Sequence, residues 1–204
     1  MDLTDVEAVL LDMDGTLVDT DAAVERAWTS WSEEHGLEPA RVLAIAHGSP
    51  GGVTVRRVLP HLDEAEAAAA TARLQAIQHA DLSGIVPGAG APELLATLDR
   101  RGLPWAVVTS SDSRMAKVTL DAVGIVPPLL LTLDDVTKGK PDPEGYLTAA
   151  ARLGVDPARC LVVEDSHPGV AAGKAAGAVV AALKGVPADL RIDGLGQVAT
   201  LLGG

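Results

Sequence analysis

Short, continuously apolar runs alternate with amphipathic stretches along most of the chain. Runs that are rich in Val and Leu and end in polar or turn-forming residues are typical of buried parallel strands. We predict strands at residues 6–11, 105–108, 129–133, 161–163 and 178–183. We predict helices between the later strands, each ending before a glycine that suits a left-handed C-terminus, at residues 91–101, 113–123, 143–153 and 168–176. This alternation favours an open α/β sheet with helices on both faces.

The alternation stops once, directly after the first predicted strand. Residues 20–83 contain amphipathic and Ala-rich helical sequence and no strand-like run. That length exceeds what a crossover between parallel strands requires. We therefore expect a Rossmann-like parallel sheet core, residues 1–18 and 85–204, with a small all-α cap domain, residues 19–84, inserted after the first strand. The alternative is that these helices simply pack beside the sheet.

Composition agrees with one ordinary domain plus a small insertion, because 204 residues leave no room for two full-sized domains. No apolar run approaches the 18 residues or so that a membrane span needs, and the N-terminus lacks the basic region of a secretory signal. The single Cys160 excludes an internal disulfide and a cysteine-rich zinc site. We expect a soluble, cytoplasmic protein, a monomer or homodimer, with no membrane partner.

The chain is strongly acidic, with 16 basic and 28 acidic residues and a formal net charge of −12. Basic runs and stacking aromatic residues, the usual means of binding nucleic acid, are missing from a chain with 2% aromatic residues. We therefore expect no nucleic-acid partner. Taken alone, the net charge also disfavours binding of any anion.

Polar residues follow four of the predicted strands. Ligands of open α/β sheets bind at the carboxyl ends of the strands, so these loops are the candidate site. The residues concerned are Asp12 and Asp14, Thr109 and Ser110, Lys140, and Glu164 and Asp165. Carboxylates at such a shared edge repel one another and need a cation, and oxygen ligands favour a hard divalent ion, most simply Mg²⁺.

The chemistry of this set points to phosphoryl transfer. Asp12 and Asp14 stand two apart on a chain that leaves a strand, so we expect both to point to the same side. A hydroxyl at Thr109, backbone amides at Ser110 and the ammonium of Lys140 are donors for a phosphoryl group. Donors of this kind beside a metal-bound carboxylate position a phosphoryl group and neutralise its charge.

At this point the chain resembles a known family. The segment 12–19, Asp-Met-Asp-Gly-Thr-Leu-Val-Asp, then Thr109 after an apolar strand, Lys140 before a proline, and the Glu164–Asp165 pair are similar to the four motifs of the haloacid dehalogenase superfamily in order and spacing. The resemblance covers the whole chain, including a helical cap between the first two motifs. Within the superfamily it looks like phosphatases of small sugar phosphates, polyol phosphates and glycerol 3-phosphate.

The resemblance implies a role for each acid. Asp12 would attack phosphorus and form an aspartyl-phosphate. Asp14 would protonate the leaving alkoxide and then act as general base for the hydrolytic water. Mg²⁺ would be held by the carboxylates of Asp12 and Asp165 and the backbone carbonyl of Asp14, with Glu164 as a direct or water-mediated ligand.

The remaining candidates would bind the substrate, which we expect to be a small phosphorylated metabolite. Thr109, the amide of Ser110 and Lys140 would bind the transferring phosphoryl oxygens. His47 and Arg56 lie in the expected cap, where a hinge could bring them over the site. The run Gly-Ser-Pro-Gly-Gly at 48–52 departs from similar cap motifs, so the resemblance does not carry over substrate contacts there.

Other readings have less support. A calcium-binding EF-hand loop starting at Asp12 would need a Glu where Ala23 stands. Residues 18–84 contain no lysine, so a Schiff base of the kind that a phosphonate-cleaving relative forms has no nucleophile. We expect a Mg²⁺-dependent phosphatase of a small sugar or polyol phosphate. A sugar phosphomutase and a non-catalytic phospho-ligand-binding protein remain the alternatives.

Overall fold

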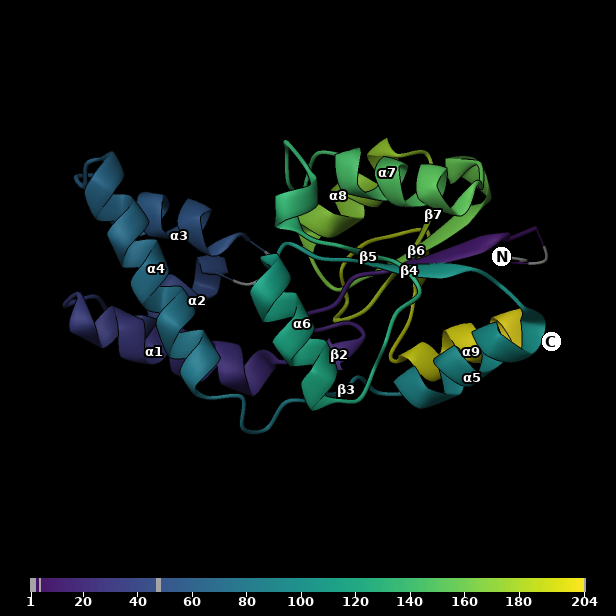
Figure 1. The fold of residues 1–204 in the computed structure, drawn as a ribbon, viewed down its shortest axis with the longest axis horizontal. Coiled ribbons are helices and arrows are strands. Elements are labelled where there is room, and N and C mark those ends of the chain that lie inside the picture. Colours follow the sequence, from purple (N-terminus) through teal and green to yellow (C-terminus); the bar gives the residue numbers. More distant parts are fainter. Residues whose placement is uncertain (1–2, 4, 47–48, 204) are drawn as a thin grey trace.

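A six-stranded, all-parallel sheet forms the centre of the computed structural model, in which residues 3, 5–46 and 49–203 are described (Figure 1). The apolar runs at 8–11 and 160–164 pair in the middle of the sheet, where both faces are covered. The strands, in spatial order, are β5 (Leu130–Leu131), β4 (Trp105–Val108), β1 (Ala8–Leu11), β6 (Cys160–Glu164), β7 (Val179–Ala182) and β8 (Leu190–Arg191).

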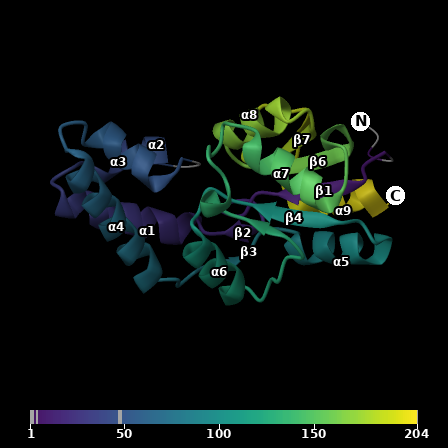
Figure 2. The same ribbon diagram turned by 45° about the horizontal axis from the view of Figure 1, so that its top comes forward.

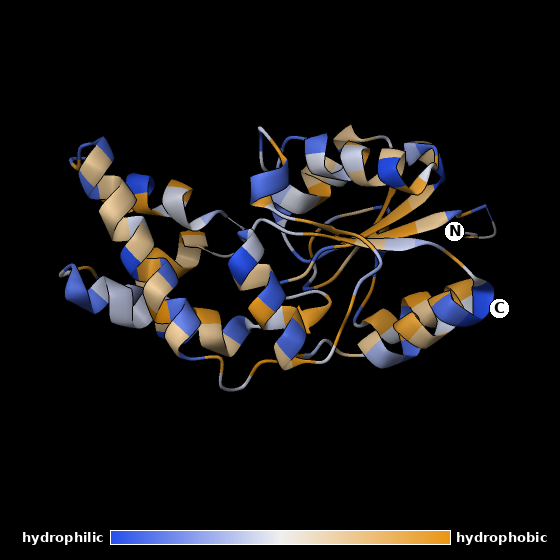
Figure 3. Ribbon diagram, in the orientation of Figure 1, coloured by the Kyte–Doolittle hydropathy of each residue, from blue (hydrophilic) through white to orange (hydrophobic). Residues whose placement is uncertain are grey.

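Helices cover the two faces of this sheet. One face carries α5 (Ala91–Arg101), α6 (Ser113–Ala122) and α9 (Leu195–Gly203), and the other carries α7 (Glu144–Leu153) and α8 (His167–Ala175) (Figure 1). Two 3₁₀ turns, Leu133–Asp135 and Pro157–Arg159, complete the connections. Successive residues of a strand point to opposite faces, so β1 contributes side chains to the hydrophobic core on each face of the sheet. Figure 3 shows the strands as predominantly hydrophobic, whereas the helices alternate between hydrophobic and hydrophilic residues.

Four helices lie beside the sheet and share a core of their own (Figure 2). They are α1 (Asp21–Glu34), α2 (Pro39–Ala46), α3 (Gly51–Val58) and α4 (Glu64–Ala80). We call them the helical group. Its centre is Trp31, which is fully buried, stacks edge-on against Trp28 at 5.3 Å between ring centroids, and donates a hydrogen bond to the Ala70 carbonyl at 2.9 Å.

The chain enters and leaves the helical group through a short antiparallel ribbon. β2 (Val18–Asp19) pairs with β3 (Val86–Pro87), which ties together two segments almost 70 residues apart in sequence. Gly88 follows β3, and a Cβ on this glycine would run into the backbone of residues 16–17. The ribbon therefore places both connections to the helical group at one edge of the sheet. In the described part of the chain, no helix is long and apolar enough to cross a membrane.

The predicted alternation of strands and helices is confirmed, and so are the four glycine helix ends. Gly102, Gly124, Gly154 and Gly177 have φ values of 61°, 68°, 73° and 85°. The sequence did not predict β8, which has two residues, nor α9, whose glycines argue against a helix. Residues 18–20 and 83–87, at the two junctions between the sheet and the helical group, contain the short strands β2 and β3.

The core of the helical group yields a stability prediction. Trp31→Ala removes a fully buried ring together with its hydrogen bond. We expect the free energy of unfolding to fall by about 3–5 kcal/mol, the usual range for a large buried side chain. Val126 is 85% exposed, so Val126→Ala serves as the control and should change the free energy by less than about 0.5 kcal/mol. Urea unfolding followed by circular dichroism measures both, and equal effects would contradict this account of the core.

Candidate active site

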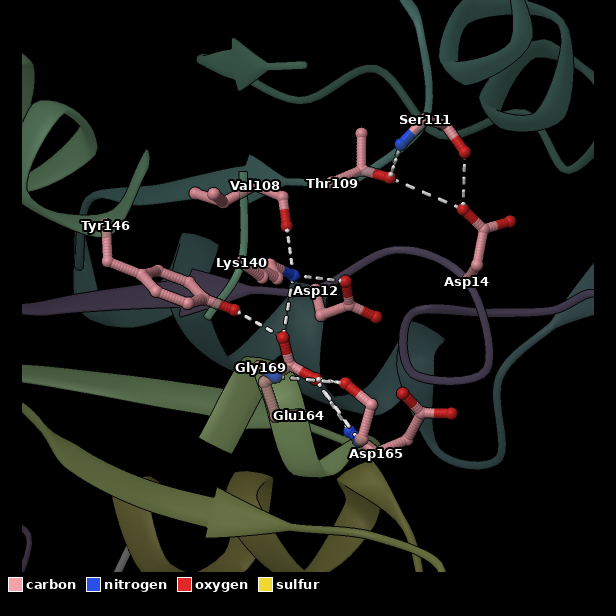
Figure 4. A network of polar contacts seen from close by, with 11 residues as sticks. Asp12, Asp14, Val108, Thr109, Ser111, Lys140, Tyr146, Glu164, Asp165 and Gly169 are labelled. Carbon is pink, nitrogen blue, oxygen red and sulfur yellow. Dashed lines mark hydrogen bonds and ion pairs between the residues drawn. The ribbon is translucent and has the colours of Figure 1, made fainter. Parts of the chain in front are cut away.

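Three adjacent strands bring the sequence-predicted polar residues to one edge of the sheet. Asp12 follows β1, Thr109 follows β4, and Glu164 ends β6 with Asp165 next to it. Since these strands are parallel and neighbours in the order β4–β1–β6, their carboxyl ends meet. Lys140 reaches the same edge from the loop before α7 (Figure 4).

An acidic cluster occupies this edge. One carboxylate oxygen from each of Asp12, Glu164 and Asp165 lies within 4.8 Å of the other two. Asp12 and Glu164 are buried, and Glu164 is completely so. Buried like charges this close repel one another, and they require a cation or protonation to coexist.

Lys140 supplies one cation to the cluster. Its Nζ donates to Asp12 Oδ1 at 2.5 Å, to Glu164 Oε1 at 2.6 Å and to the Val108 carbonyl at 2.9 Å, while only 7% of the side chain is exposed (Figure 4). By contrast, Lys138 is largely exposed and its nearest acid, Asp142, is 4.0 Å away. The lysine that the sequence favoured is therefore the one at the site.

Burial and charge shift the ionisation of these groups. Burial raises the pKa of Asp12 well above its ordinary value, and the Glu164 carboxylate adds to this while Lys140 opposes it. Burial also raises the pKa of Asp165, against the opposing effect of Lys184. For Lys140, burial alone would lower the pKa, but the carboxylates of Asp12 and Glu164 outweigh it and raise the pKa well above its usual range. The ammonium of Lys140 thus stays charged.

Glu164 is held by several donors in addition to Lys140. The Tyr146 hydroxyl donates to Oε1 at 2.7 Å, while Oε2 accepts from the Ser166 hydroxyl at 3.0 Å and from the Asp165 amide at 3.1 Å. Burial, with the Glu164 charge, raises the pKa of Tyr146, which keeps it a donor. Glu164 therefore has a fixed orientation within the acidic cluster. Tyr146 could not be selected from the sequence, because it lies inside a helix and not at the end of a strand.

Asp14 lies apart from the cluster, in a hydroxyl-rich environment. Ser111 donates to its Oδ2 at 3.0 Å and Thr109 does so at 3.3 Å (Figure 4). Burial raises the pKa of Asp14, and these hydrogen bonds limit the rise. The chain turns at residues 13–17 instead of continuing extended, so the same-side argument for Asp12 and Asp14 does not apply. Both nevertheless line one cavity.

Lys184 is a second cation that the motifs did not reveal. It follows β7, and its φ of 52° makes it the one non-glycine residue with a left-handed backbone in the described part of the chain. Its Nζ donates to both carboxylate oxygens of Asp21 at 2.7 Å and lies 3.0 Å from Asp165 Oδ2. A Cβ at Gly15 would collide with Asp165 and Lys184, so the glycine allows this approach. The sequence signal that could have identified Lys184 is its position just after the carboxyl end of a predicted strand.

A cavity of about 510 Å³ separates the sheet edge from the helical group. It has the size of a small-molecule site. Asp12, Asp14 and Asp165 form one wall with Thr109, Ser110 and Lys140, and residues of α1, α3 and α4 form the opposite wall. The seven core residues named from sequence thus all lie at or beneath this cavity.

The two cap residues named from sequence have different outcomes. Arg56 lines the cavity, but its guanidinium makes two hydrogen bonds to Glu64, at 3.0 and 2.6 Å. His47 lies outside the described residues. Contacts that the sequence did not suggest come from α4, where Gln75 Nε2 donates to Asp112 Oδ2 at 3.0 Å and joins the helical group to the start of α6.

The model of one protein family matches most of this chain. It is described as haloacid dehalogenase-like hydrolase and covers residues 6–177. The chain belongs to this family. It is thus a hydrolase, and the resemblance seen in its four motifs is confirmed.

Named relatives agree with this membership. The chain is 42% identical to hexitol phosphatase A of Escherichia coli, over 88% of this chain and 83% of that protein. It is 36% identical to 2-deoxyglucose-6-phosphate phosphatase 1 of Saccharomyces cerevisiae, over 83% and 76%. The crystal structure of a HAD hydrolase, family IA, variant 3, from Entamoeba histolytica shares the fold, with a TM-score of 0.85, 22% identity and coverage of 98% and 100%.

Gly169 provides a test of the geometry beneath the cluster. A Cβ at this position would overlap the Glu164 carboxylate. We expect Gly169→Ala to displace Glu164, to lower the free energy of unfolding by about 1–3 kcal/mol through overpacking, and to reduce hydrolytic activity. In the control Gly196→Ala, the new Cβ meets its nearest neighbour at 3.9 Å. Urea unfolding and hydrolytic activity are measured for both variants. A Gly169→Ala enzyme with unchanged stability and activity would refute the fixed orientation of Glu164.

Proposed function

We propose that this hydrolase is a Mg²⁺-dependent phosphatase that releases phosphate from a small sugar or polyol phosphate through an aspartyl-phosphate intermediate. The observation that carries the proposal is the position of Asp12, which faces the cavity with Lys140 on one side and Asp165 within the same acidic cluster. The names of the two relatives, a hexitol phosphatase and a 2-deoxyglucose-6-phosphate phosphatase, support this substrate class.

The donor set fits Mg²⁺. All of its ligand atoms are oxygens, as a small hard cation requires. The four carboxylates at this edge outnumber the ammonium groups of Lys140 and Lys184, and a divalent cation would offset the excess negative charge. The carboxylates of Asp12 and Asp165 and the backbone carbonyl of Asp14 would hold it, with Glu164 oriented behind them. When bound, the cation supplies charge neutralisation for the phosphoryl oxygens.

Asp12 is the proposed nucleophile. One of its carboxylate oxygens bonds to phosphorus while the bond from phosphorus to the leaving oxygen breaks. The leaving alkoxide takes its proton from Asp14. Because burial raises the pKa of Asp14, this carboxyl can carry a proton at the start of the step. Ser111, which donates to Asp14 at 3.0 Å, keeps it oriented and leaves the Thr109 hydroxyl for the phosphoryl group.

Hydrolysis of the aspartyl-phosphate then restores the enzyme. Asp14, now ionised, removes a proton from water, whose oxygen bonds to phosphorus as the bond to Asp12 breaks. Lys140, Thr109 and the Ser110 amide line the cavity beside Asp12 and are the proposed donors to the phosphoryl oxygens. Inorganic phosphate then leaves, and the proton that Asp14 took from water returns this carboxyl to its starting state.

We further propose that the helical group acts as a cap over the cavity, with residues 19–84 as its extent. Three observations support this: its separate core, its entry and exit through the β2–β3 ribbon, and its contribution of the wall opposite Asp12. A cap excludes water during the first chemical step and contacts the leaving group.

Substitution of the nucleophile tests the mechanism. We expect Asp12→Asn to reduce phosphate release from glucitol 6-phosphate by at least about 10³-fold, because the amide cannot form the covalent intermediate. The control is Asp121→Asn, which changes an exposed carboxylate on α6. Phosphate release with Mg²⁺ and circular dichroism of each variant provide the measurements. Undiminished turnover in the folded Asp12→Asn protein would disprove the assignment.

Metal binding gives a pH prediction. Protonated carboxyls do not bind Mg²⁺, and the pKa values of Asp12 and Asp165 are raised in the folded protein. An acid with a raised pKa in the folded state lowers the stability of the fold when it is ionised, which occurs above that raised pKa. As the pH falls through the raised pKa values of Asp12 and Asp165, protonation removes this loss of stability. We therefore expect the rise in melting temperature caused by Mg²⁺ to be larger at pH 7.5 than at pH 5. Equal shifts at both pH values, or none, would contradict the proposed site, and Asp165→Asn should diminish the effect.

A further inference from the structure

We infer that the site selects phosphate monoesters whose leaving group carries no second negative charge. This inference rests on the proposed function and deepens it, because it concerns the part of the cavity that faces away from Asp12. The sequence does not identify the residues that contact the leaving group. The names of the relatives do not state which residues exclude other substrates.

The cation that could receive a second anion is already paired. Among the described residues that line the cavity, the cations are Lys140, which lies with the acidic cluster, and Arg56 on α3. Arg56 directs two guanidinium nitrogens at the two carboxylate oxygens of Glu64, at 3.0 and 2.6 Å. A two-point contact of this kind matches carboxylate geometry closely. A carboxylate or phosphate on the leaving group would have to displace Glu64 to obtain the same contact.

Two further acidic residues, outside the cluster, also line the cavity. Asp112 lines it, where it caps α6 through the Met115 amide at 2.8 Å and accepts from Gln75. Asp21 lines it as well and is paired with Lys184. A second anion in the leaving group would therefore enter a cavity that these carboxylates line, without an unpaired ammonium or guanidinium among the described lining residues. Like charges at such contacts are disfavoured by several kcal/mol.

The neutral polar groups of the same wall suit hydroxyls instead. Thr71, Gln75 and Gln78 line the cavity from α4. The two glutamine amides carry both donor and acceptor atoms, whereas the Thr71 hydroxyl donates to the Ala67 carbonyl at 2.8 Å and leaves an acceptor oxygen. Trp28 and Leu74 add apolar surface between them. Alternating hydroxyl and carbon surfaces are the features of a sugar or polyol, so the wall complements an uncharged polyhydroxy leaving group.

The Arg56–Glu64 pair is open to a specific test because it is exposed. The side chains of Arg56 and Glu64 are 55% and 84% exposed, so their mutual attraction contributes little to folding. Glu64→Gln keeps the shape of the side chain and removes its charge, which frees the guanidinium of Arg56 for another anion. Glu64 is thus assigned a role in specificity that does not involve touching the reacting atoms.

The first measurement compares two substrates with the unmodified enzyme. Glucitol 6-phosphate has an uncharged leaving group, and 2-phosphoglycolate has one that carries a carboxylate. With Mg²⁺ we expect kcat/KM for glucitol 6-phosphate to exceed that for 2-phosphoglycolate by at least about 100-fold, as an unmatched charge in a site of this kind requires. Comparable values for the two substrates would overturn the inference.

The second measurement asks whether Glu64 sets this preference. We expect Glu64→Gln to reduce the ratio by about 10-fold, through faster hydrolysis of 2-phosphoglycolate. The control is Glu34→Gln, which breaks the similar pair with Arg73 in the helical group, at 2.8 and 2.5 Å, away from the cavity lining. It should leave the ratio unchanged, and the double variant Arg56→Gln with Glu64→Gln should lose the gain. A ratio that Glu64→Gln does not alter would refute the role of Glu64.

Binding to the Asp12→Asn variant separates this inference from the proposed function. Calorimetric titration of that variant with each phosphate monoester, with Mg²⁺ present, reports the preference without turnover. Failure of the unmodified enzyme to hydrolyse either compound would count against the proposed phosphatase. Tighter binding of glucitol 6-phosphate than of 2-phosphoglycolate would still support the selectivity, and the reverse order would overturn it.

Discussion

The site depends on one compensation of charge, the ammonium of Lys140 between the buried carboxylates of Asp12 and Glu164. Two carboxylates that have lost their hydration are costly unless a cation meets both, and Lys140 does so at 2.5 and 2.6 Å. The contact fixes the position of Asp12 and the loop before α7 relative to each other. Tyr146, Ser166 and the backbone near Asp165 complete the coordination of Glu164, which binds the end of β6 into the same network.

The bulk charge of the chain gives a misleading picture of this site. A net charge of −12 describes the surface and disfavours polyanionic partners such as nucleic acid. Within the cavity, however, the local balance is set by the acids of one sheet edge, by Lys140 and Lys184, and by whether a divalent cation is present. An acidic protein can therefore accept a phosphate, provided that the acids hold a metal first.

Sequence reasoning predicted the sheet and the edge that carries the candidate site, because both follow from local pattern. Apolar runs predict buried strands, and the rule that ligands bind at their carboxyl ends selected Asp12, Thr109 and Asp165 without any coordinates. Sequence reasoning could not identify Tyr146 or Gln75, because the contacts of a residue inside a helix depend on how the helices pack. Lys184 was not selected for a different reason, because a lone lysine in a loop is usually solvated. The short strand β8 was too brief to leave a pattern.

The scarcity of aromatic residues has a consequence for observing this molecule. The chain has 3 Trp, 1 Tyr and no Phe. Trp28 and Trp31 both belong to α1 in the helical group, and Trp28 lines the cavity, whereas Trp105 begins β4 in the sheet. Two of the three tryptophans thus belong to the helical group, and one of them, Trp28, lines the cavity. The tryptophan emission of the protein is consequently weighted toward the helical group, and Trp28 places one natural fluorophore at the cavity itself.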